Sequence, residues 1–274
     1  MRRMTLAIII FEILFALAVF AQGEEIIYTN GKYEGSYVDG KKSGMGQAIL
    51  NDGTTYNGEW KNDKRNGVGR ATFIDGSSYY GDWKDDMRHG KGTYNFKTGD
   101  KYTGQFENNQ IHGWGTYVYA NGNKYTGEIM HGAVTGKGSV HYANGERYEG
   151  TVVNGTKSGK GKYTYSNGNI YDGAFVADKK DGFGKMIFAN GDVYEGEFKD
   201  NHRTGTGLFT WANGDRYEGE FANGVMQGKG LFTWANGDKF EGTWDNNIRN
   251  GKGKLITKDG QQTVQLYNYG RAQN

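Results

Sequence analysis

The chain has 274 residues and an unusual composition for a globular domain, since 47 are Gly, none is Pro or Cys, and 15% are aromatic. Disordered chains are rich in Pro and poor in aromatic residues, so this composition favours an ordered chain without a thick aliphatic core. The 33 basic and 31 acidic residues leave no basic excess of the kind that nucleic-acid binding needs, and no nucleic-acid partner is expected.

The N-terminal segment has the pattern of a secretory signal peptide. Two arginines precede an apolar run over residues 5–21. Val19 and Ala21 are small enough to precede a cleavage site, which we place before Gln22. We therefore predict that residues 1–21 are removed and that the mature protein is secreted, periplasmic or lumenal in the secretory pathway. The alternative is an uncleaved membrane anchor through residues 5–21, although this run is short for a bilayer span and contains a glutamate.

The rest of the chain is dominated by a tandem repeat of 23 residues. Ten copies align without a gap over residues 33–262, and each has Gly at its third, twelfth, fourteenth and twenty-first places, counted from the first residue of the copy. These places hold 40 of the 47 glycines, so glycine has a positional role. The copies begin at Tyr33, Tyr56, Tyr79, Tyr102, Tyr125, Tyr148, Tyr171, Tyr194, Tyr217 and Phe240.

Each copy predicts a β-hairpin, because two runs of alternating residues flank a turn. In the ninth copy Tyr217, Gly219 and Phe221 share one face of the first run. The second run begins at Gly228, and the eighth place between the runs is always Gly, Asn or Asp, which tolerate left-handed backbone. We predict an all-β fold, an elongated, twisted, single-layer antiparallel array of roughly 20 strands. Rings at the first, fifth, sixteenth and eighteenth places are expected to form its thin core.

The repeat glycines are expected to lie beneath rings of the opposite strand. The predicted pairs are Tyr217 with Trp234, Gly219 with Phe232, Phe221 with Gly230, and Gly150 with Tyr163. A three-residue loop or a glycine bulge in the second turn, "ANGDK", is expected to set Trp234 opposite Phe240.

The segments that flank the ten copies look like end caps. Residues 22–32 contain "EEIIYTNGK", which resembles a partial copy. Residues 263–274 contain "TVQLYNY", which predicts a closing strand and a short tail.

The repeated phrase resembles the MORN repeat, as in "YNGEWKNDKRNGVGRATF", where Tyr-x-Gly-x-Trp is followed by a turn and then Gly-x-Gly. The resemblance implies an elongated array of β-hairpins that acts as a scaffold, dimerises, or associates with membranes and phospholipids. Such arrays also occur beside phosphatidylinositol phosphate kinase and histone-lysine methyltransferase domains, but the 12 residues after the last copy are too few for either. Structural positions of the repeat include Tyr33, Gly35, Tyr56, Gly58, Trp60, Gly150, Tyr217, Gly219, Gly228 and Gly230.

No catalytic, cofactor or metal site is predicted. The chain has no Cys nucleophile, and its Gly-x-Gly motifs lie in predicted strands rather than before helices, so they form no phosphate-binding loop. His89 and His112 share the eleventh place of adjacent copies, where we expect turn residues about 10 Å apart, too far to share a zinc ion. We predict a non-catalytic scaffold for a protein partner or a second copy of the chain, with binding of a phospholipid surface as the alternative.

Five apolar residues occupy places that are polar in most copies. Met45, Val68, Trp114 and Phe183 stand at the thirteenth place, and Tyr80 stands at the second. Two explanations remain open, local packing under the twist or contact with a partner, and Trp114 is the strongest candidate for such contact.

One sequence motif indicates a covalent modification. Asn154 begins the chain's one Asn-x-Ser/Thr motif, and it lies in a predicted exposed turn. Glycosylation of Asn154 is therefore expected if the source organism glycosylates exported proteins.

Overall fold

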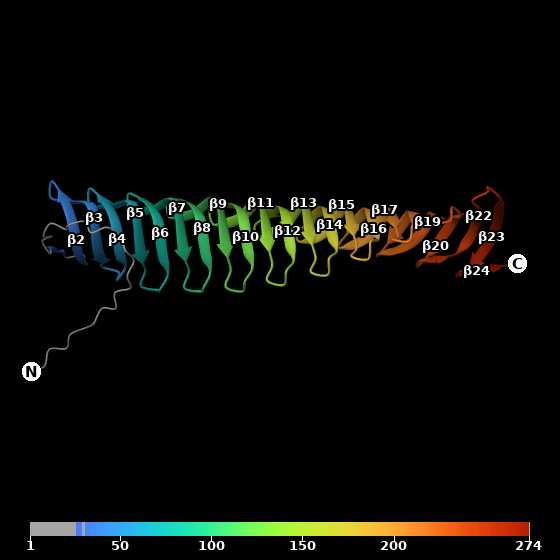
Figure 1. The fold of residues 1–274 in the computed structure, drawn as a ribbon, viewed down its shortest axis with the longest axis horizontal. Coiled ribbons are helices and arrows are strands. Elements are labelled where there is room, and N and C mark those ends of the chain that lie inside the picture. The colour runs from blue at the N-terminus through green and yellow to red at the C-terminus, as the bar shows by residue number, and fades with distance from the viewer. Residues whose placement is uncertain (1–25, 29–30, 274) are drawn as a thin grey trace, which may run out of the picture.

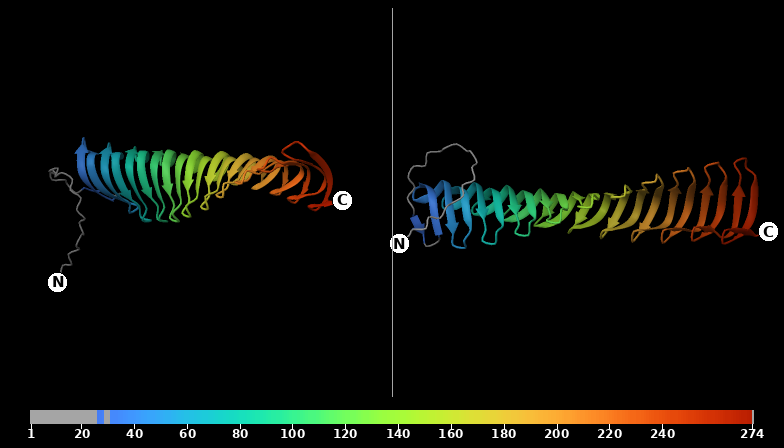
Figure 2. Two further views of the ribbon diagram at one scale, coloured as in Figure 1. Left: turned by 45° about the vertical axis from the view of Figure 1, so that its right-hand side comes forward. Right: turned by 60° about the horizontal axis from the view of Figure 1, so that its bottom comes forward.

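The structure is a computed structural model that describes residues 26–28 and 31–273. Within these residues, 24 strands form one antiparallel sheet, which confirms the predicted all-β array. The strands run across the long axis of the molecule, so the sheet is a long single layer (Figure 1). The sheet also turns about its long axis from one end to the other, as expected when strand twist accumulates (Figure 2). The predicted signal peptide, residues 1–21, lies outside the described residues.

The strands follow the chain in order, two to each copy, with one strand of the tenth copy divided at Asn250. They are β1 Ile26–Tyr28, β2 Gly31–Val38, β3 Lys41–Leu50, β4 Thr55–Lys61, β5 Lys64–Thr72, β6 Ser78–Lys84, β7 Met87–Asn95, β8 Lys101–Glu107, β9 Gln110–Val118, β10 Lys124–Met130, β11 Ala133–His141, β12 Arg147–Val153, β13 Thr156–Thr164, β14 Ile170–Val176, β15 Lys179–Ile187, β16 Val193–Lys199, β17 His202–Thr210, β18 Arg216–Ala222, β19 Val225–Thr233, β20 Lys239–Asp245, β21 Ile248–Arg249, β22 Gly251–Ile256, β23 Gln262–Asn268 and β24 Arg271–Gln273.

The two strands of each copy are joined by a two-residue turn with left-handed backbone. In the ninth copy these residues are Asn223 and Gly224, with φ of 49° and 87°. Positive φ at both positions is the requirement of a type I′ turn, whose twist matches that of the strands. The prediction for the eighth place is confirmed in all ten copies. The seventh place shares this backbone, even where it carries His131 or Ala177.

The pairing within each hairpin differs from the prediction. In the ninth copy the observed pairs are Tyr217 with Phe232, Gly219 with Gly230, and Phe221 with Met226. The cause is a β-bulge in which residues 227–229 all lie opposite Glu220, with Gly228 at φ 73°. Because the bulge adds two residues to one strand, every side chain keeps its predicted face while its partner changes.

The loop between consecutive copies is longer than predicted. Thr233 pairs with Lys239 and Phe232 pairs with Phe240, so Trp234 is not opposite Phe240. The intervening loop, residues 234–238, is closed by a hydrogen bond of 2.9 Å from the Trp234 N–H to the Asp238 carbonyl. The Asn-Gly signal therefore belongs to a five-residue loop.

The repeat glycines serve two different purposes. The third-place and fourteenth-place glycines face each other, and Gly150 accordingly pairs with Gly161 and not with Tyr163. A ring does cover them, but it belongs to the first place of the same copy, because a Cβ on Gly161 would lie 2.4 Å from the Tyr148 ring. The twelfth-place and twenty-first-place glycines instead have positive φ in every copy, a backbone that residues with a Cβ rarely adopt.

The first-place tyrosine also closes the bulge through its hydroxyl. In nine copies this hydroxyl donates to the fourth-place carbonyl over 2.8 to 3.0 Å. In the ninth copy the bulge leaves Glu220 without a paired residue in the second strand of its hairpin, and the Tyr217 hydroxyl donates to the Glu220 carbonyl. The tenth copy has Phe240 instead, and there the Asn250 N–H donates to the Thr243 carbonyl over 2.9 Å.

Adjacent copies are joined along both edges of the sheet as well as through their strands. The Asp178 N–H donates to the Lys157 carbonyl over 3.0 Å, and Asp178 Oδ1 accepts the Lys157 N–H over 2.9 Å. On the opposite edge, Asp215 Oδ1 accepts the Ala235 N–H over 2.8 Å. The same contacts recur between other copies, so each turn is held by its neighbour.

The segment after the tenth copy continues the pattern by half a copy. β23 pairs with β22, and β24 then pairs with β23, so the predicted closing strand is followed by another. Tyr267 stands at the fifth place of this half copy, and its ring lies 5.2 Å from that of Phe240. At the other end, β1 pairs with β2.

Candidate binding surface

The rings of the first and fifth places form the core of the array. The first-place rings are between 0% and 2% exposed in all ten copies. Seven of them pack edge-on against two fifth-place rings, as Tyr217 does with Phe221 of its own copy at 5.2 Å and with Trp244 of the next at 5.4 Å. The predicted thin aromatic core is confirmed for these places. The row of rings is interrupted only where Ile129 and Val152 take the fifth place among the copies described.

The rings of the sixteenth and eighteenth places extend this core to the surface. We call the side of the sheet that carries the first, fifth, tenth, sixteenth and eighteenth places the aromatic face. Trp211, Phe232 and Trp234 are half-buried there. The ring centre of Phe232 lies 5.2 Å from that of Trp211 and 5.0 Å from that of Trp234. The aromatic face therefore presents a row of partly accessible rings along the array.

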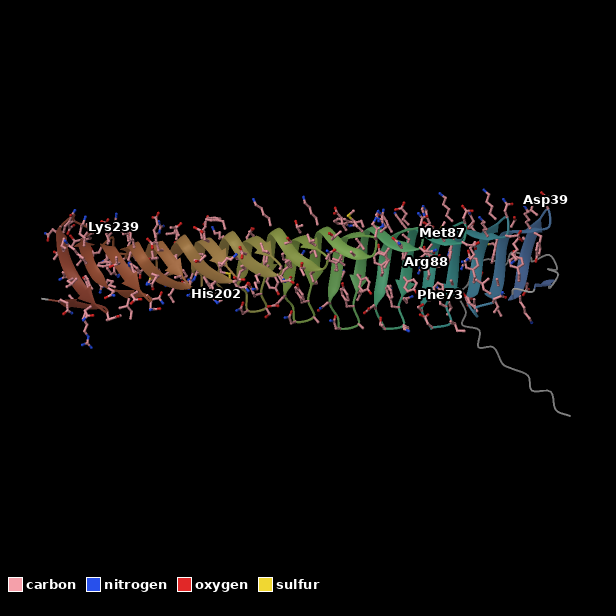
Figure 3. The ribbon with its side chains drawn as sticks, turned by 180° about the vertical axis from the view of Figure 1, so that it is seen from behind. Asp39, Phe73, Met87, Arg88, His202 and Lys239 are labelled. Carbon is pink, nitrogen blue, oxygen red and sulfur yellow. The ribbon has the colours of Figure 1, made fainter. Side chains whose placement is uncertain are left out.

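Positively charged side chains lie among these rings. Each comes from the tenth place, which is separated from the type I′ turn by one residue and pairs with the fifth place. The guanidinium carbon of Arg88, for example, lies 5.9 Å from the ring centre of Phe73, and both residues are labelled in Figure 3. Such cation–π contacts contribute about 0.5 to 2 kcal/mol each. The seven residues of this kind are Lys42, Arg65, Arg88, Lys157, Lys180, Arg203 and Arg249.

Only some of these cations have a carboxylate partner among the described residues. Arg65 Nε lies 3.1 Å from Asp86 Oδ1, and Lys157 Nζ lies 2.9 Å from Asp178 Oδ1. Both carboxylates belong to the eighth place of the following copy. Next to Lys180 and Arg203, that place holds the uncharged residues Asn201 and Gly224.

Sequence reasoning missed this row of cations. The signal is present, because seven of the ten tenth-place residues are Lys or Arg. Ile111, Val134 and Met226 take the tenth place in the other copies and weaken the pattern. The bulge that brings the tenth place opposite the fifth is also absent from the predicted register.

The five predicted partner-contact residues lie on the opposite side of the sheet, which we call the polar face. All five are exposed, Trp114 at 53% and Phe183 at 64%, and the Arg70 guanidinium carbon lies 5.5 Å from the ring centre of Tyr80, so both explanations stay open. They do not form one patch. Met45, Val68 and Tyr80 lie on the nearby strands β3, β5 and β6, whereas Trp114 and Phe183 are on β9 and β15. Contact with a partner through these residues stays a prediction.

The two eleventh-place histidines lie in strands rather than in the turns that the sequence predicts. His89 is in β7 and His112 is in β9, and with Asp82 and Glu107 they line a shallow hollow. His112 Nε2 lies 3.7 Å from Glu107 Oε2. Within the described residues, no group of three or more His, Cys, Asp or Glu is arranged to hold a metal ion. The same part of the chain contains no helix long and apolar enough to span a membrane.

The predicted glycosylation site lies on the surface. Asn154 is exposed in a type I′ turn, at φ 49°. Its Thr156 hydroxyl donates to the Val153 carbonyl over 2.8 Å.

Comparison with protein families gives one match, repeated along the chain. The family model of the MORN repeat matches residues 33–55, 56–78, 79–101, 102–124, 125–147, 148–170, 171–193, 194–216, 217–239 and 240–262. These ten matches coincide with the ten copies read from the sequence. No curated protein matches the chain in sequence.

Several solved structures resemble parts of the sheet weakly. The TCP domain of SAS-4 (dCPAP) of Drosophila melanogaster, in complex with a proline-rich motif of Ana2 (dSTIL), is 17% identical, with 65% of this chain and 90% of that chain covered and a TM-score of 0.39. The TCP10 domain of Danio rerio CPAP is 10% identical, with 79% and 96% covered and a TM-score of 0.43. These likenesses are too weak to bear on function.

Proposed function

The chain belongs to the MORN-repeat family, and from this premise we propose that it is a non-catalytic scaffold that binds a protein partner on its aromatic face. The observation that carries the proposal is the row of half-buried rings with cations among them, on a single-layer sheet whose aromatic face is not covered by any other described element. Aromatic residues and Arg are enriched at the centres of protein interfaces, where they contribute most of the binding energy.

Substitution of tryptophans on the two faces tests which of them binds. Trp211→Ser with Trp234→Ser removes rings of the aromatic face, and Trp114→Ser removes a ring of the polar face. We expect a partner captured from the source organism by the native protein to be lost with the first variant and retained with the second. Loss with Trp114→Ser alone would move the interface to the polar face. Retention by both variants would contradict the proposal, provided that circular dichroism shows both to be folded.

We also propose that the protein is exported, on the pattern of residues 1–21. Intact-mass measurement of material from the source organism is expected to place the N-terminus at Gln22. Full-length protein of 30.5 kDa in the membrane fraction would instead support an anchor through residues 5–21.

A phospholipid surface is the second candidate ligand, and the seven cations of the aromatic face favour it, since anionic membranes attract clustered Lys and Arg. The twist weakens it, because a flat bilayer meets only the few copies that face it in one direction. Flotation with liposomes at two salt concentrations separates the candidates. Binding that needs anionic lipid and fades with salt would favour the membrane, and no flotation would favour a protein partner.

A second copy of the chain is included among the protein partners. Sedimentation velocity over a series of protein concentrations tests this directly. A species of twice the monomer mass that dissociates on dilution would identify self-association, and a monomer at all concentrations would leave a different protein as the partner.

A further inference from the structure

We propose that Lys180 and Arg203 form an anion-binding site on the aromatic face, and that its ligand is an extended acidic peptide segment of the partner. This inference rests on the proposed function of that face. It adds the chemical class of the ligand and the copies that contact it.

The two cations occupy equivalent positions in consecutive copies. Lys180 lies on β15 and Arg203 on β17, so one strand separates them and the spacing is about 10 Å. The Lys180 Nζ lies 5.5 Å from the ring centre of Phe198, and the Arg203 guanidinium carbon lies 5.6 Å from that of Phe221. Both charged groups are therefore held over rings, in a fixed row along the sheet.

The surroundings of these two charges differ from those of Lys157. Among the described residues no carboxylate forms an ion pair with Lys180 or Arg203, whereas Lys157 in the preceding copy is paired with Asp178. Burial, and then the neighbouring charge of Arg203, lower the pKa of Lys180, and burial lowers the pKa of Arg203. Each charge has thus lost part of its hydration without gaining a counterion among the described residues, although Arg203 Nη2 donates to the Gly224 carbonyl. An anionic ligand would supply the counterion.

The spacing of the cations indicates the conformation of the ligand. A polyproline II segment rises about 3.1 Å per residue with three residues per turn, so its side chains at i and i+3 lie on one side about 9 Å apart. Carboxylates at every third residue therefore match Lys180 and Arg203. Segments of this kind dock on aromatic surfaces, and here Phe188 and Phe209 lie between the copies with ring centres 5.9 Å apart.

A labelled peptide of repeating Glu-Pro-Pro triplets is the probe, and fluorescence anisotropy on the full chain is the measurement. Lys180→Met with Arg203→Met is expected to weaken its binding by at least about ten-fold. Met226 stands at the same place two copies later than Lys180 and one copy later than Arg203, so the fold tolerates methionine there. The matched control is Lys162→Met with Lys185→Met, which removes two exposed charges from the polar face and is expected to leave binding unchanged.

Three results would overturn the proposal. Equal weakening by both double variants would mean that the probe responds to net charge alone. Equal binding by the native chain and the Lys180→Met, Arg203→Met variant would place the anion elsewhere, and phosphatidylserine vesicles bound through these residues without any peptide binding would make the ligand a lipid. If the Trp211→Ser, Trp234→Ser variant still abolishes partner capture while the Lys180→Met, Arg203→Met variant changes nothing, the aromatic face binds the partner and only the anionic class is wrong.

Discussion

Addition of one methyl group at Gly150 tests whether the first-place ring fills the space above the strand glycines. Gly150 does not have left-handed backbone, so alanine is conformationally allowed there. A Cβ at this position would nevertheless lie 2.4 Å from the Tyr148 hydroxyl oxygen and 2.6 Å from the Gly161 Cα. Contacts this short do not occur between real atoms, so either the ring or the facing strand has to move.

The cost of Gly150→Ala follows from three contributions. Overpacking of a well-filled site costs about 1 to 3 kcal/mol. Displacement of the Tyr148 hydroxyl breaks its bond of 2.8 Å to the Thr151 carbonyl, which costs about 1 kcal/mol more. Alanine recovers about 0.5 to 1 kcal/mol, because it loses less backbone entropy on folding than glycine. The net destabilisation is therefore about 2 kcal/mol, with overpacking as the largest contribution.

Urea unfolding and hydrogen exchange measure this change. Each copy contacts only its neighbours, so the amides of the fifth to seventh copies should lose protection first while the ends keep theirs. Thr151→Val, one residue along on the polar face, is the control and should be nearly neutral. An unchanged or higher urea midpoint for Gly150→Ala would refute the packing of the ring over the glycine pair.

Three substitutions and one covalent modification test other features. Ala177 has φ 46°, a left-handed backbone that costs most residues with a Cβ about 1 to 2 kcal/mol but that Asn tolerates, because its short polar side chain hydrogen-bonds locally. Ala177→Asn should therefore raise the urea midpoint. Tyr194→Phe removes the hydroxyl bond to a fourth-place carbonyl and should lower the free energy of unfolding by about 1 kcal/mol in the same assay. Burial raises the pKa of Asp178, but the hydrogen bonds and charge of Lys157 outweigh it and hold the pKa below its usual value. The stability that ionised Asp178 contributes is present above the unfolded pKa of about 3.9 and is lost as pH falls through the lower folded pKa. Asp178→Asn should therefore show a shallower loss of stability in acid. Asn154, exposed in its turn, should carry a glycan in a glycosylating host, and intact mass before and after peptide N-glycosidase would detect it.

The sequence predicts the architecture well because the repeat is gapless and strand side chains alternate. Both features survive in the structure, where Tyr217, Gly219 and Phe221 share the face predicted for them. The register is not predictable in the same way, since a bulge of two extra residues changes every cross-strand partner but leaves alternation intact. The glycine pattern alone does not tell whether a place requires glycine for close packing or for positive φ. Close packing is the reason at the third and fourteenth places, and positive φ is the reason at the twelfth and twenty-first.

The proposed binding surface is predictable only in part. Apolar residues at polar places point to the polar face, where Trp114 and Phe183 are exposed, and their contact with a partner stays a prediction. The position of the cations on the aromatic face can be predicted only when the strand register is known. A side chain at the tenth place reaches the rings because the bulge sets it opposite the fifth place. From the sequence alone, nothing therefore distinguishes Lys180 and Arg203 from other polar residues near a turn.

The direction of the strands also decides how the protein responds to mechanical load. The strands cross the long axis, so the hydrogen bonds between them run along it (Figure 1). Tension applied to the two chain ends then opens the bonds of the outermost strand one after another, and the force never loads all the bonds of a strand pair at once. Each copy that detaches releases up to about 80 Å of extended chain. Under load the protein would lengthen stepwise from its ends while the copies between them keep their structure.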